Sequence, residues 1–143
     1  MRRIYCLLLL FICLLISVDS FAQWRFVQKF NDSGEEHWVS EDYSIDENGY
    51  YIIKLKRIFP KKYKDNWVIK HHYVIETNAI SHDLKKCRTL YEVWYDNDGN
   101  ISEKKDKSYQ TWYPMPSGKV TSGIDAAYST MREIIQSKKH QYH

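Results

Sequence analysis

Histidine side chains are the first place to look for chemistry in this chain of 143 residues. His71 and His72 are adjacent in an alternating stretch, so a regular strand would point them to opposite faces, where they cannot share one metal ion. His71 falls on the apolar face, which favours a core histidine over a metal ligand or a general base. His82-Asp83 could belong to a site, but the pair falls in a loop and a solvated loop is the favoured interpretation. The sequence therefore predicts no metal site.

Cys87 is the only cysteine outside the first 22 residues. Its neighbours Lys85, Lys86 and Arg88 would lower the pKa of the thiol if they were close to it in space, but a small strand residue is the favoured interpretation. The sequence shows no nucleophile-elbow serine, no glycine-rich phosphate loop and no paired carboxylates at a suggestive spacing. We therefore expect a protein that is not an enzyme and needs no cofactor.

A basic run between residues 54 and 64 is the most suggestive surface feature. A strand and its following loop would present these side chains as a positive patch to acidic glycans, anionic lipid or an acidic protein. The alternative is a solvated surface that opposes aggregation. The candidate binding residues in this run are Lys54, Lys56, Arg57, Lys61, Lys62, Tyr63 and Lys64.

The first 22 residues predict a secretory signal peptide. Arg2 and Arg3 precede an apolar stretch, and Ser20-Phe21-Ala22 supplies small residues before a cleavage point. The apolar stretch is shorter than the roughly 18 residues expected of a membrane span, although an uncleaved N-terminal anchor is the alternative. We expect residues 23–143 to form one exported domain, in the periplasm or at the surface of a bacterium, with no membrane span.

The charge of the expected mature chain is nearly balanced. Removing residues 1–22 takes away two arginines and one aspartate, which lowers the formal net charge from +3 to +2. That balance gives no reason to expect a nucleic-acid partner. A single cysteine leaves no internal disulfide in an exported domain, so the hydrophobic core must hold the fold together.

Strand patterns dominate the first two thirds of the expected domain. Strands are predicted at 24–27, 37–39, 51–59, 67–77, 88–95 and 101–109, with 78–86 as a connection. In the third strand, Tyr51, Ile53, Leu55 and Phe59 share one face, with Lys54 and Lys56 on the other. In the fourth, the shared apolar face is Trp67, Ile69, His71, Tyr73 and Ile75. Alternation of this kind is typical of half-buried antiparallel strands joined by short turns.

The period changes near the C-terminus. A stripe at helical spacing predicts one amphipathic helix, and it consists of Ile124, Ala127, Tyr128, Met131, Ile134 and Ile135. Such a helix can cover one face of the sheet. We therefore predict an α+β fold, an antiparallel meander of about six strands with one C-terminal helix packed on a face.

The stretch TWYPMPSG, residues 111–118, must carry the chain from the last strand to the helix. Pro114 and Pro116 stiffen this crossing segment and bar it from continuing the strand. Trp112 and Tyr113 have large apolar bodies with one polar tip each, and we predict that they pin the crossing segment to the sheet or helix. Gly118 permits a sharp bend. A ligand-facing aromatic pair is the alternative.

These motifs resemble those of the surface-adhesin protein E-like domain, a small exported bacterial module. The resemblance runs from about Trp38 to Ile135 and is most specific in the crossing segment, which resembles the family's "W-x-P-I-P-x-(G/S)" motif. Residues 88–99 resemble its "R…YD-x-G" hairpin. The resemblance implies structural roles for Trp112, Pro114, Pro116, Gly118, Asp96 and Gly99. The chain departs from the family in lacking two cysteines that the family often has, one after the fourth strand and one at the end of the helix.

The resemblance implies an exported binding domain that acts by protein–protein contact, with a host matrix protein as the implied partner class. If the helix covers one face, an aromatic from the pair Tyr91 and Trp94 must lie on the other, and exposed aromatics make a homodimer plausible. The alternative is a periplasmic small-ligand or glycan-binding module that uses Trp112 and Tyr113 as stacking platforms.

Overall fold

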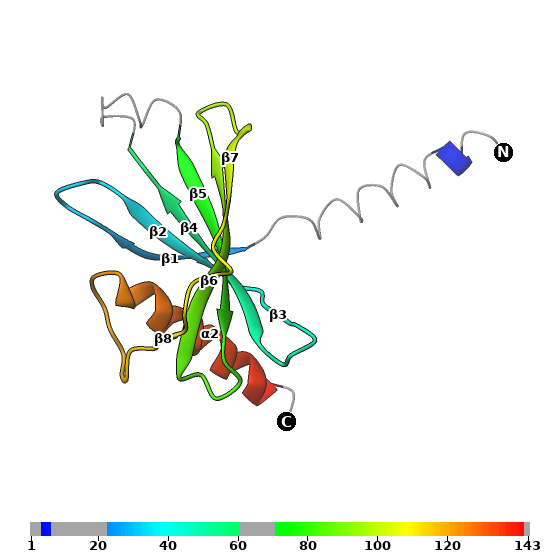
Figure 1. Cartoon of the computed structure of the whole chain (residues 1–143). Helices are drawn as coiled ribbons and strands as arrows, with labels where there is room; N and C mark the ends of the chain where they lie inside the picture. The colour runs from blue at the N-terminus through cyan, green and yellow to red at the C-terminus, as the bar shows by residue number, and fades with distance from the viewer. Residues whose placement is uncertain (1–3, 7–22, 61–70, 142–143) are drawn as a thin grey trace.

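The computed structural model describes residues 4–6, 23–60 and 71–141. An antiparallel sheet of eight strands curls into a half-barrel, and a C-terminal helix lies on one side of it (Figure 1). The elements are β1 (Trp24–Lys29), β2 (Glu36–Ser40), β3 (Ser44–Ile45), β4 (Tyr51–Ile58), β5 (Tyr73–Ile80), β6 (Lys86–Tyr95), β7 (Ile101–Asp106), β8 (Tyr113–Pro114) and α2 (Asp125–Gln141).

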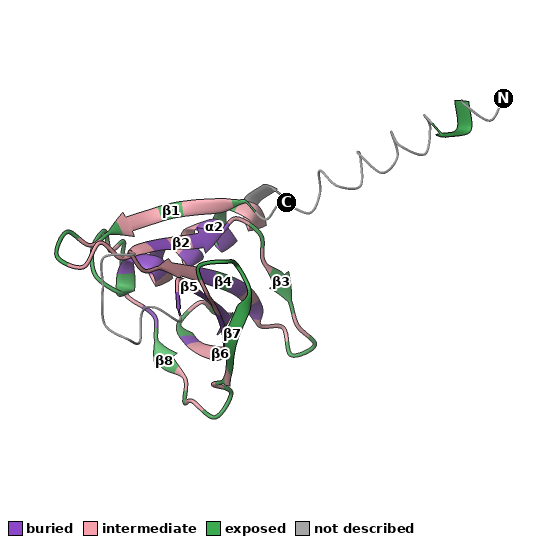
Figure 2. Cartoon of the chain, turned by 90° about the horizontal axis from the view of Figure 1, so that it is seen from above, coloured by how far each residue is buried: buried purple, intermediate pink, exposed green. Residues whose placement is uncertain are grey.

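The main path of the sheet is a meander of six strands, in the order β1-β2-β4-β5-β6-β7. Its six strands correspond to the six predicted ones. The two-residue strands β3 and β8 are additions, paired to β4 and β6. β7 forms one edge of the sheet and is exposed along most of its length (Figure 2).

The alternation in β4 separates two faces of the sheet. Tyr51, Ile53 and Leu55 are at most 2% exposed, whereas Lys54 between them is exposed. The buried side, which carries α2, is called the inner face below, and the opposite side the outer face. This strand confirms the prediction, because successive side chains of a regular strand point to opposite faces.

The buried face predicted for the fourth strand, β5, was wrong. The inner-face residues are Val74 and Glu76, both buried, whereas Tyr73 and Ile75 lie on the outer face. The register explains this, because Leu55 of the inner face pairs with Glu76. Trp67 and Ile69 lie outside the described residues. The strand also continues to Ile80 through a stretch predicted to be a connection.

The helix α2 packs its apolar stripe against the inner face. Ala127, Met131, Ile134 and Ile135 have no exposed surface and join β2, β4 and β5 residues in one hydrophobic core. Ile124 is 61% exposed and precedes the first helical residue, so its inclusion in the stripe was wrong. The helix backbone lies nearest β1, β2 and β4, while its side chains share the hydrophobic core with residues of β5 and β6.

An Asp-Gly turn joins β6 to β7. Asp96 Oδ1 accepts hydrogen bonds from the backbone N–H groups of Asp98 and Asn100, each at 2.9 Å. Gly99 has a φ of 80°, a conformation that favours glycine. Asp96 and Gly99 thus have structural roles.

Within the described ranges, no helix combines the length and apolar character that crossing a membrane requires.

Candidate functional site

The predicted basic patch is divided between the two faces of the sheet. Lys54 and Lys56 lie on the outer face of β4, while Arg57 turns to the inner face, where it pairs with carboxylates. The remaining members of the run, Lys61, Lys62, Tyr63 and Lys64, lie outside the described residues. Arg57 lies on the other face from Lys54 and Lys56 because successive side chains of a strand point to opposite faces.

The outer face carries a row of aromatic side chains around Lys56. The Nζ atom of Lys56 lies 4.6 Å from the ring centroid of Tyr73 and 5.8 Å from that of Trp24. The row consists of Trp24, Phe26, Trp38, Tyr73 and Tyr95, and is called the aromatic row below.

Members of the aromatic row contact one another across the strands. Phe26 meets Trp38 edge to face at 5.0 Å, and Tyr73 stacks on Tyr95 at 4.6 Å. Phe26 is 48% exposed, and the other four are half-buried. α2 packs on the opposite face of the sheet, so the helix does not cover the aromatic row.

Arg57 joins two carboxylates on the inner face. Its Nη2 lies 2.9 Å from Oε1 of Glu76, and its Nη1 lies 3.4 Å from Oε1 of Glu35. The same Glu35 oxygen accepts a hydrogen bond from Nε2 of His37 at 2.9 Å. This hydrogen bond lowers the pKa of Glu35, with Arg57 adding to the effect. Burial raises the pKa of Glu76, although Arg57 opposes that change.

This ionic group is connected to the helix through polar side chains. Tyr128 of α2 lies near Glu76 and hydrogen-bonds Thr89, and burial raises its pKa to about 12. Thr89 Oγ1 in turn donates to Oδ1 of Asn78 at 2.9 Å. Because buried polar groups cost stability unless they are paired, this arrangement fixes how α2 sits on the sheet. Glu76, Asn78 and Tyr128 were not predicted to act together.

His71 and Cys87, which were considered for metal binding or nucleophilic chemistry, are both buried. His71 is buried, with Nδ1 2.8 Å from Oγ of Ser102 and its ring against Trp94. Cys87 is 4% exposed in β6, and burial raises the pKa of its thiol to about 11. The basic neighbours therefore do not lower that pKa. Among the described residues, no three His, Cys, Asp or Glu side chains gather where they could hold a metal ion.

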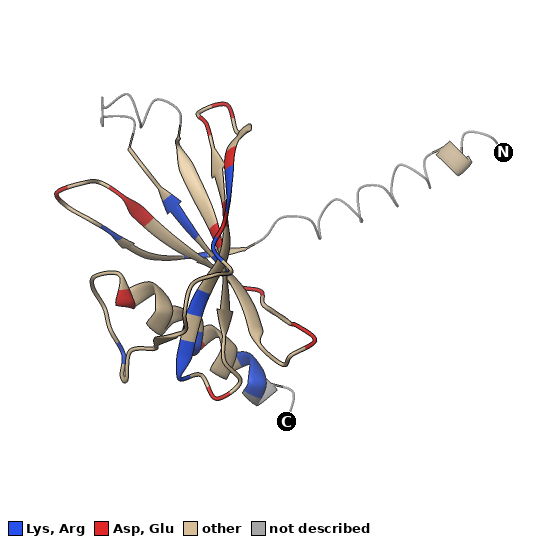
Figure 3. Ribbon diagram, viewed as in Figure 1, with Lys and Arg blue, Asp and Glu red and all other residues tan. Residues whose placement is uncertain are grey.

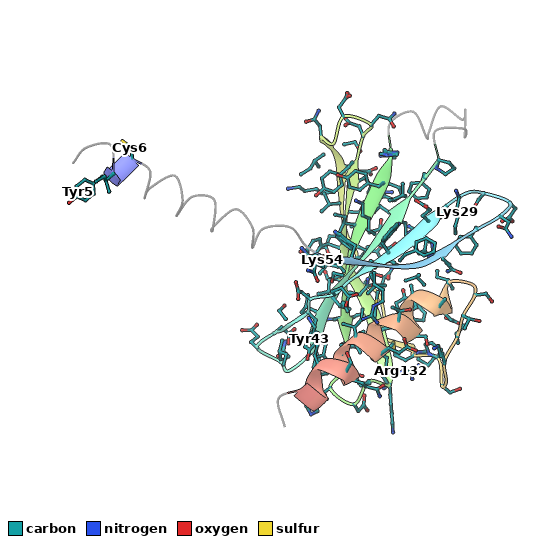
Figure 4. The ribbon with its side chains drawn as sticks, turned by 180° about the vertical axis from the view of Figure 1, so that it is seen from behind. Tyr5, Cys6, Lys29, Tyr43, Lys54 and Arg132 are labelled. Atoms are coloured by element: carbon teal, nitrogen blue, oxygen red, sulfur yellow. The ribbon has the colours of Figure 1, made fainter. Side chains whose placement is uncertain are left out.

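The crossing segment is held at both ends. Trp112 is half-buried, and its ring meets Tyr50 at 5.0 Å with the guanidinium of Arg88 4.8 Å from its centroid. Arg132, which extends from α2 (Figure 4), donates to the backbone carbonyls of Pro116 and Gly118. Trp112 thus pins the segment to the sheet, as predicted.

Two details of the crossing segment differ from the prediction. Tyr113 is 56% exposed, so its side chain does not anchor the segment, whereas Met115 is buried in the core. Tyr113 and Pro114 also form the short strand β8, paired with Lys86 and Cys87. Proline is compatible with such an edge position because its missing N–H can face away from the ladder.

Trp112 also lines an open pocket of about 410 Å³ beside the β5–β6 hairpin. The other lining residues are Tyr50, Ser81, His82, Asp83 and Lys86. His82 and Asp83 thus occupy an exposed loop, as expected, but they also border a pocket with Trp112. Sequence patterns did not point to Tyr50, Lys86 or Arg88 as neighbours of Trp112, because these residues come together only when β4, β5, β6 and β8 pair.

No family model, curated protein or solved structure matches this chain. The interpretation of the site therefore depends on its own residues, and the resemblance to the protein E-like domain depends on sequence motifs.

Proposed function

We propose that this chain is an exported, non-enzymatic binding domain of the surface-adhesin protein E-like type, which acts by protein–protein contact through the outer face of its sheet. The observation that carries the proposal is the aromatic row, where Phe26 is 48% exposed. Neighbouring aromatic side chains that stay at least partly exposed on a folded domain are a common mark of an interaction surface. The partner class implied by the resemblance is a host matrix protein.

The charge of the outer face indicates the chemistry of the partner. Lys54 is exposed beside the aromatic row, and Lys56 lies within it. A complementary surface would offer apolar side chains to the rings and carboxylates to the lysines. Aromatic anchors at the centre of an interface contribute most of its binding energy, while charges at its rim mainly raise the association rate.

Two measurements test this proposal. Protease shaving of intact cells should remove the domain, and the purified protein should bind at least one member of a panel of immobilised matrix proteins. Phe26→Ser should weaken that binding about tenfold or more, as expected for an interface anchor. Tyr109→Ser is the matched control, because Tyr109 is 75% exposed and lies outside the aromatic row.

A domain protected from protease would exclude host adhesion. Equal losses of binding in the two variants would show that the aromatic row is not part of the binding surface.

The second candidate partner is another copy of this chain, and light scattering tests for it. A dimer that Phe26→Ser converts to monomer would assign the aromatic row to self-association instead.

A further inference from the structure

We infer that the Trp112 pocket binds an acidic saccharide, with a sugar ring against Trp112 and a carboxylate facing Lys86 and Arg88. The pocket lies beside the β5–β6 hairpin and has a volume of about 410 Å³, within the range of roughly 300–1,000 Å³ of small-molecule sites. This site is separate from the protein contact proposed above, so each can fail without the other.

Positive charge around the pocket exceeds negative charge. Lys86 lines it, and Arg88 contacts the lining residue Trp112, with its guanidinium 4.8 Å from the centroid of that ring. Neither cation has a carboxylate within ion-pair distance among the residues that the structure describes. Nε of Arg88 is also buried without a hydrogen-bond partner there. A buried donor of this kind is costly unless a ligand or water satisfies it.

The one acidic lining residue is already engaged. Asp83 Oδ1 accepts hydrogen bonds from Oγ of Ser81 at 2.6 Å and from the backbone N–H of Lys85 at 3.1 Å, and these hold its pKa below the usual value. Its single negative charge is outweighed by Lys85, Lys86 and Arg88, which colour the hairpin end of β6 blue in Figure 3. The pocket therefore favours an anion.

The hairpin loop itself limits which anion fits. Two of its amide groups are occupied, since the N–H of Lys85 bonds Asp83 and the N–H of Lys86 bonds Oγ of Ser81 at 3.0 Å. Phosphate sites are commonly built from free backbone N–H groups in nests or at helix N-termini. Recognition by two side-chain cations suits a carboxylate, because arginine and lysine bind carboxylates well without backbone help.

The rings of the pocket favour a sugar as the body of the ligand. Trp112 and Tyr50 meet edge to face at 5.0 Å, so they present a broad apolar wall with polar tips. The C–H face of a pyranose carries partial positive charge and packs against the negative face of such a ring. His82 supplies a nearby donor or acceptor for sugar hydroxyls.

The loop is held in one conformation before any ligand arrives. Leu84 has a φ of 62°, which is unusual for a residue other than glycine, and its side chain packs against the hydrophobic core. A strained residue persists only when its surroundings determine it. A pre-ordered loop reduces the entropy lost on binding.

Titration calorimetry with a hyaluronan tetrasaccharide, which carries glucuronate, tests the inference, with neutral chitotetraose and inorganic phosphate as comparison ligands. The acidic tetrasaccharide should bind at least about tenfold more tightly than either. Lys86→Gln and Arg88→Gln should each weaken it by about tenfold, the size expected from losing one charge-assisted hydrogen bond. Lys86 is exposed, so its variant should fold normally.

Lys29→Gln is the control, because Lys29 is an exposed lysine at the end of β1 and does not line the pocket. Its substitution makes the same change in net charge and should leave binding unaltered. Four results would overturn the inference. They are no binding of the acidic tetrasaccharide, equal binding of the neutral one, equal binding of phosphate, or the same loss in the Lys29→Gln variant as in the pocket variants.

Discussion

The guanidinium of Arg57 lies 2.9 Å from the carboxylate of Glu76 on the inner face of the sheet, where the Glu76 side chain is only 9% exposed. Removing both charges from water costs stability, and their attraction offsets that cost only while the pair is intact. The two residues come from neighbouring strands, β4 and β5. The pair therefore adds a buried side-chain contact to the backbone ladder that aligns these strands.

Arg57→Met should destabilise the protein by about 3 kcal/mol or more near neutral pH, because it leaves the Glu76 carboxylate buried without its partner. Lys54→Met is the matched control on the same strand, and its exposed position predicts a change within about 0.5 kcal/mol. Urea unfolding measures both. The double variant Arg57→Met/Glu76→Met should recover most of the loss. If Arg57→Met loses no more stability than the control, the ion pair contributes little to the stability of the fold.

Glu35 and Glu76 should affect the pH dependence of stability in opposite directions. The hydrogen bond from His37 lowers the pKa of Glu35, so its contribution is present above the unfolded-state pKa and is lost as the pH falls through the folded-state pKa. Burial raises the pKa of Glu76, so its contribution is present below the unfolded-state pKa and is lost as the pH rises through the folded-state pKa.

Urea unfolding of Glu35→Gln and Glu76→Gln over the acid-to-neutral range checks these signs. Relative to the wild type, Glu35→Gln should be most destabilised near neutral pH, and the difference should shrink in acid. Glu76→Gln should gain on the wild type as the pH rises from acid toward neutral. Curves that stay parallel to the wild type would show that neither carboxyl has a folded-state pKa different from its unfolded-state value.

Sequence patterns correctly predicted the elements in which the buried residues follow strand alternation or helical spacing. Tyr51 on β4 and Met131 on α2 lie in the core, where alternation and helical spacing placed them. β5 was assigned the wrong buried face because Glu76 and Asn78 are polar yet point inward. Their partners come from other strands, so no pattern within β5 could show that a carboxylate is paired there.

The same distinction applies to the candidate sites. The aromatic, proline-rich composition of the crossing segment indicated that Trp112 would pack on the sheet or the helix, and its ring lies against Tyr50 and against Arg88 of β6. The pocket beside it depends on Tyr50, which precedes β4, and on Lys86, the first residue of β6, and both line it only in the folded sheet. The basic run was assigned to one surface, but Arg57 points to the face opposite Lys54.

Cys87 should make the protein sensitive to alkali. Burial raises the pKa of its thiol from 9.0 to about 11, and the nearby Asp125 adds to the effect. A raised folded-state pKa means that the contribution is present below the unfolded-state value and is lost as the pH rises through the folded-state value. Stability should therefore decline between about pH 9 and 11.

Cys87→Ala isolates this effect from the lysines and tyrosines that titrate in the same range. The variant should be less stable near neutral pH because it loses buried volume, but the difference from the wild type should narrow as the pH increases. Unfolding in urea at several alkaline pH values measures that difference. A constant difference would mean that the thiol titrates alike in the folded and unfolded chains.

Met115 and Tyr113 of the crossing segment should contribute unequally to the stability of the fold. Met115→Ala should cost about 2–5 kcal/mol, because Met115 is buried in the core and its removal leaves a cavity. Tyr113→Ala, two positions earlier, should change the free energy of unfolding by less than about 0.5 kcal/mol, since that side chain is 56% exposed. Equal losses in urea unfolding would mean that Tyr113, as the sequence first suggested, also anchors the segment.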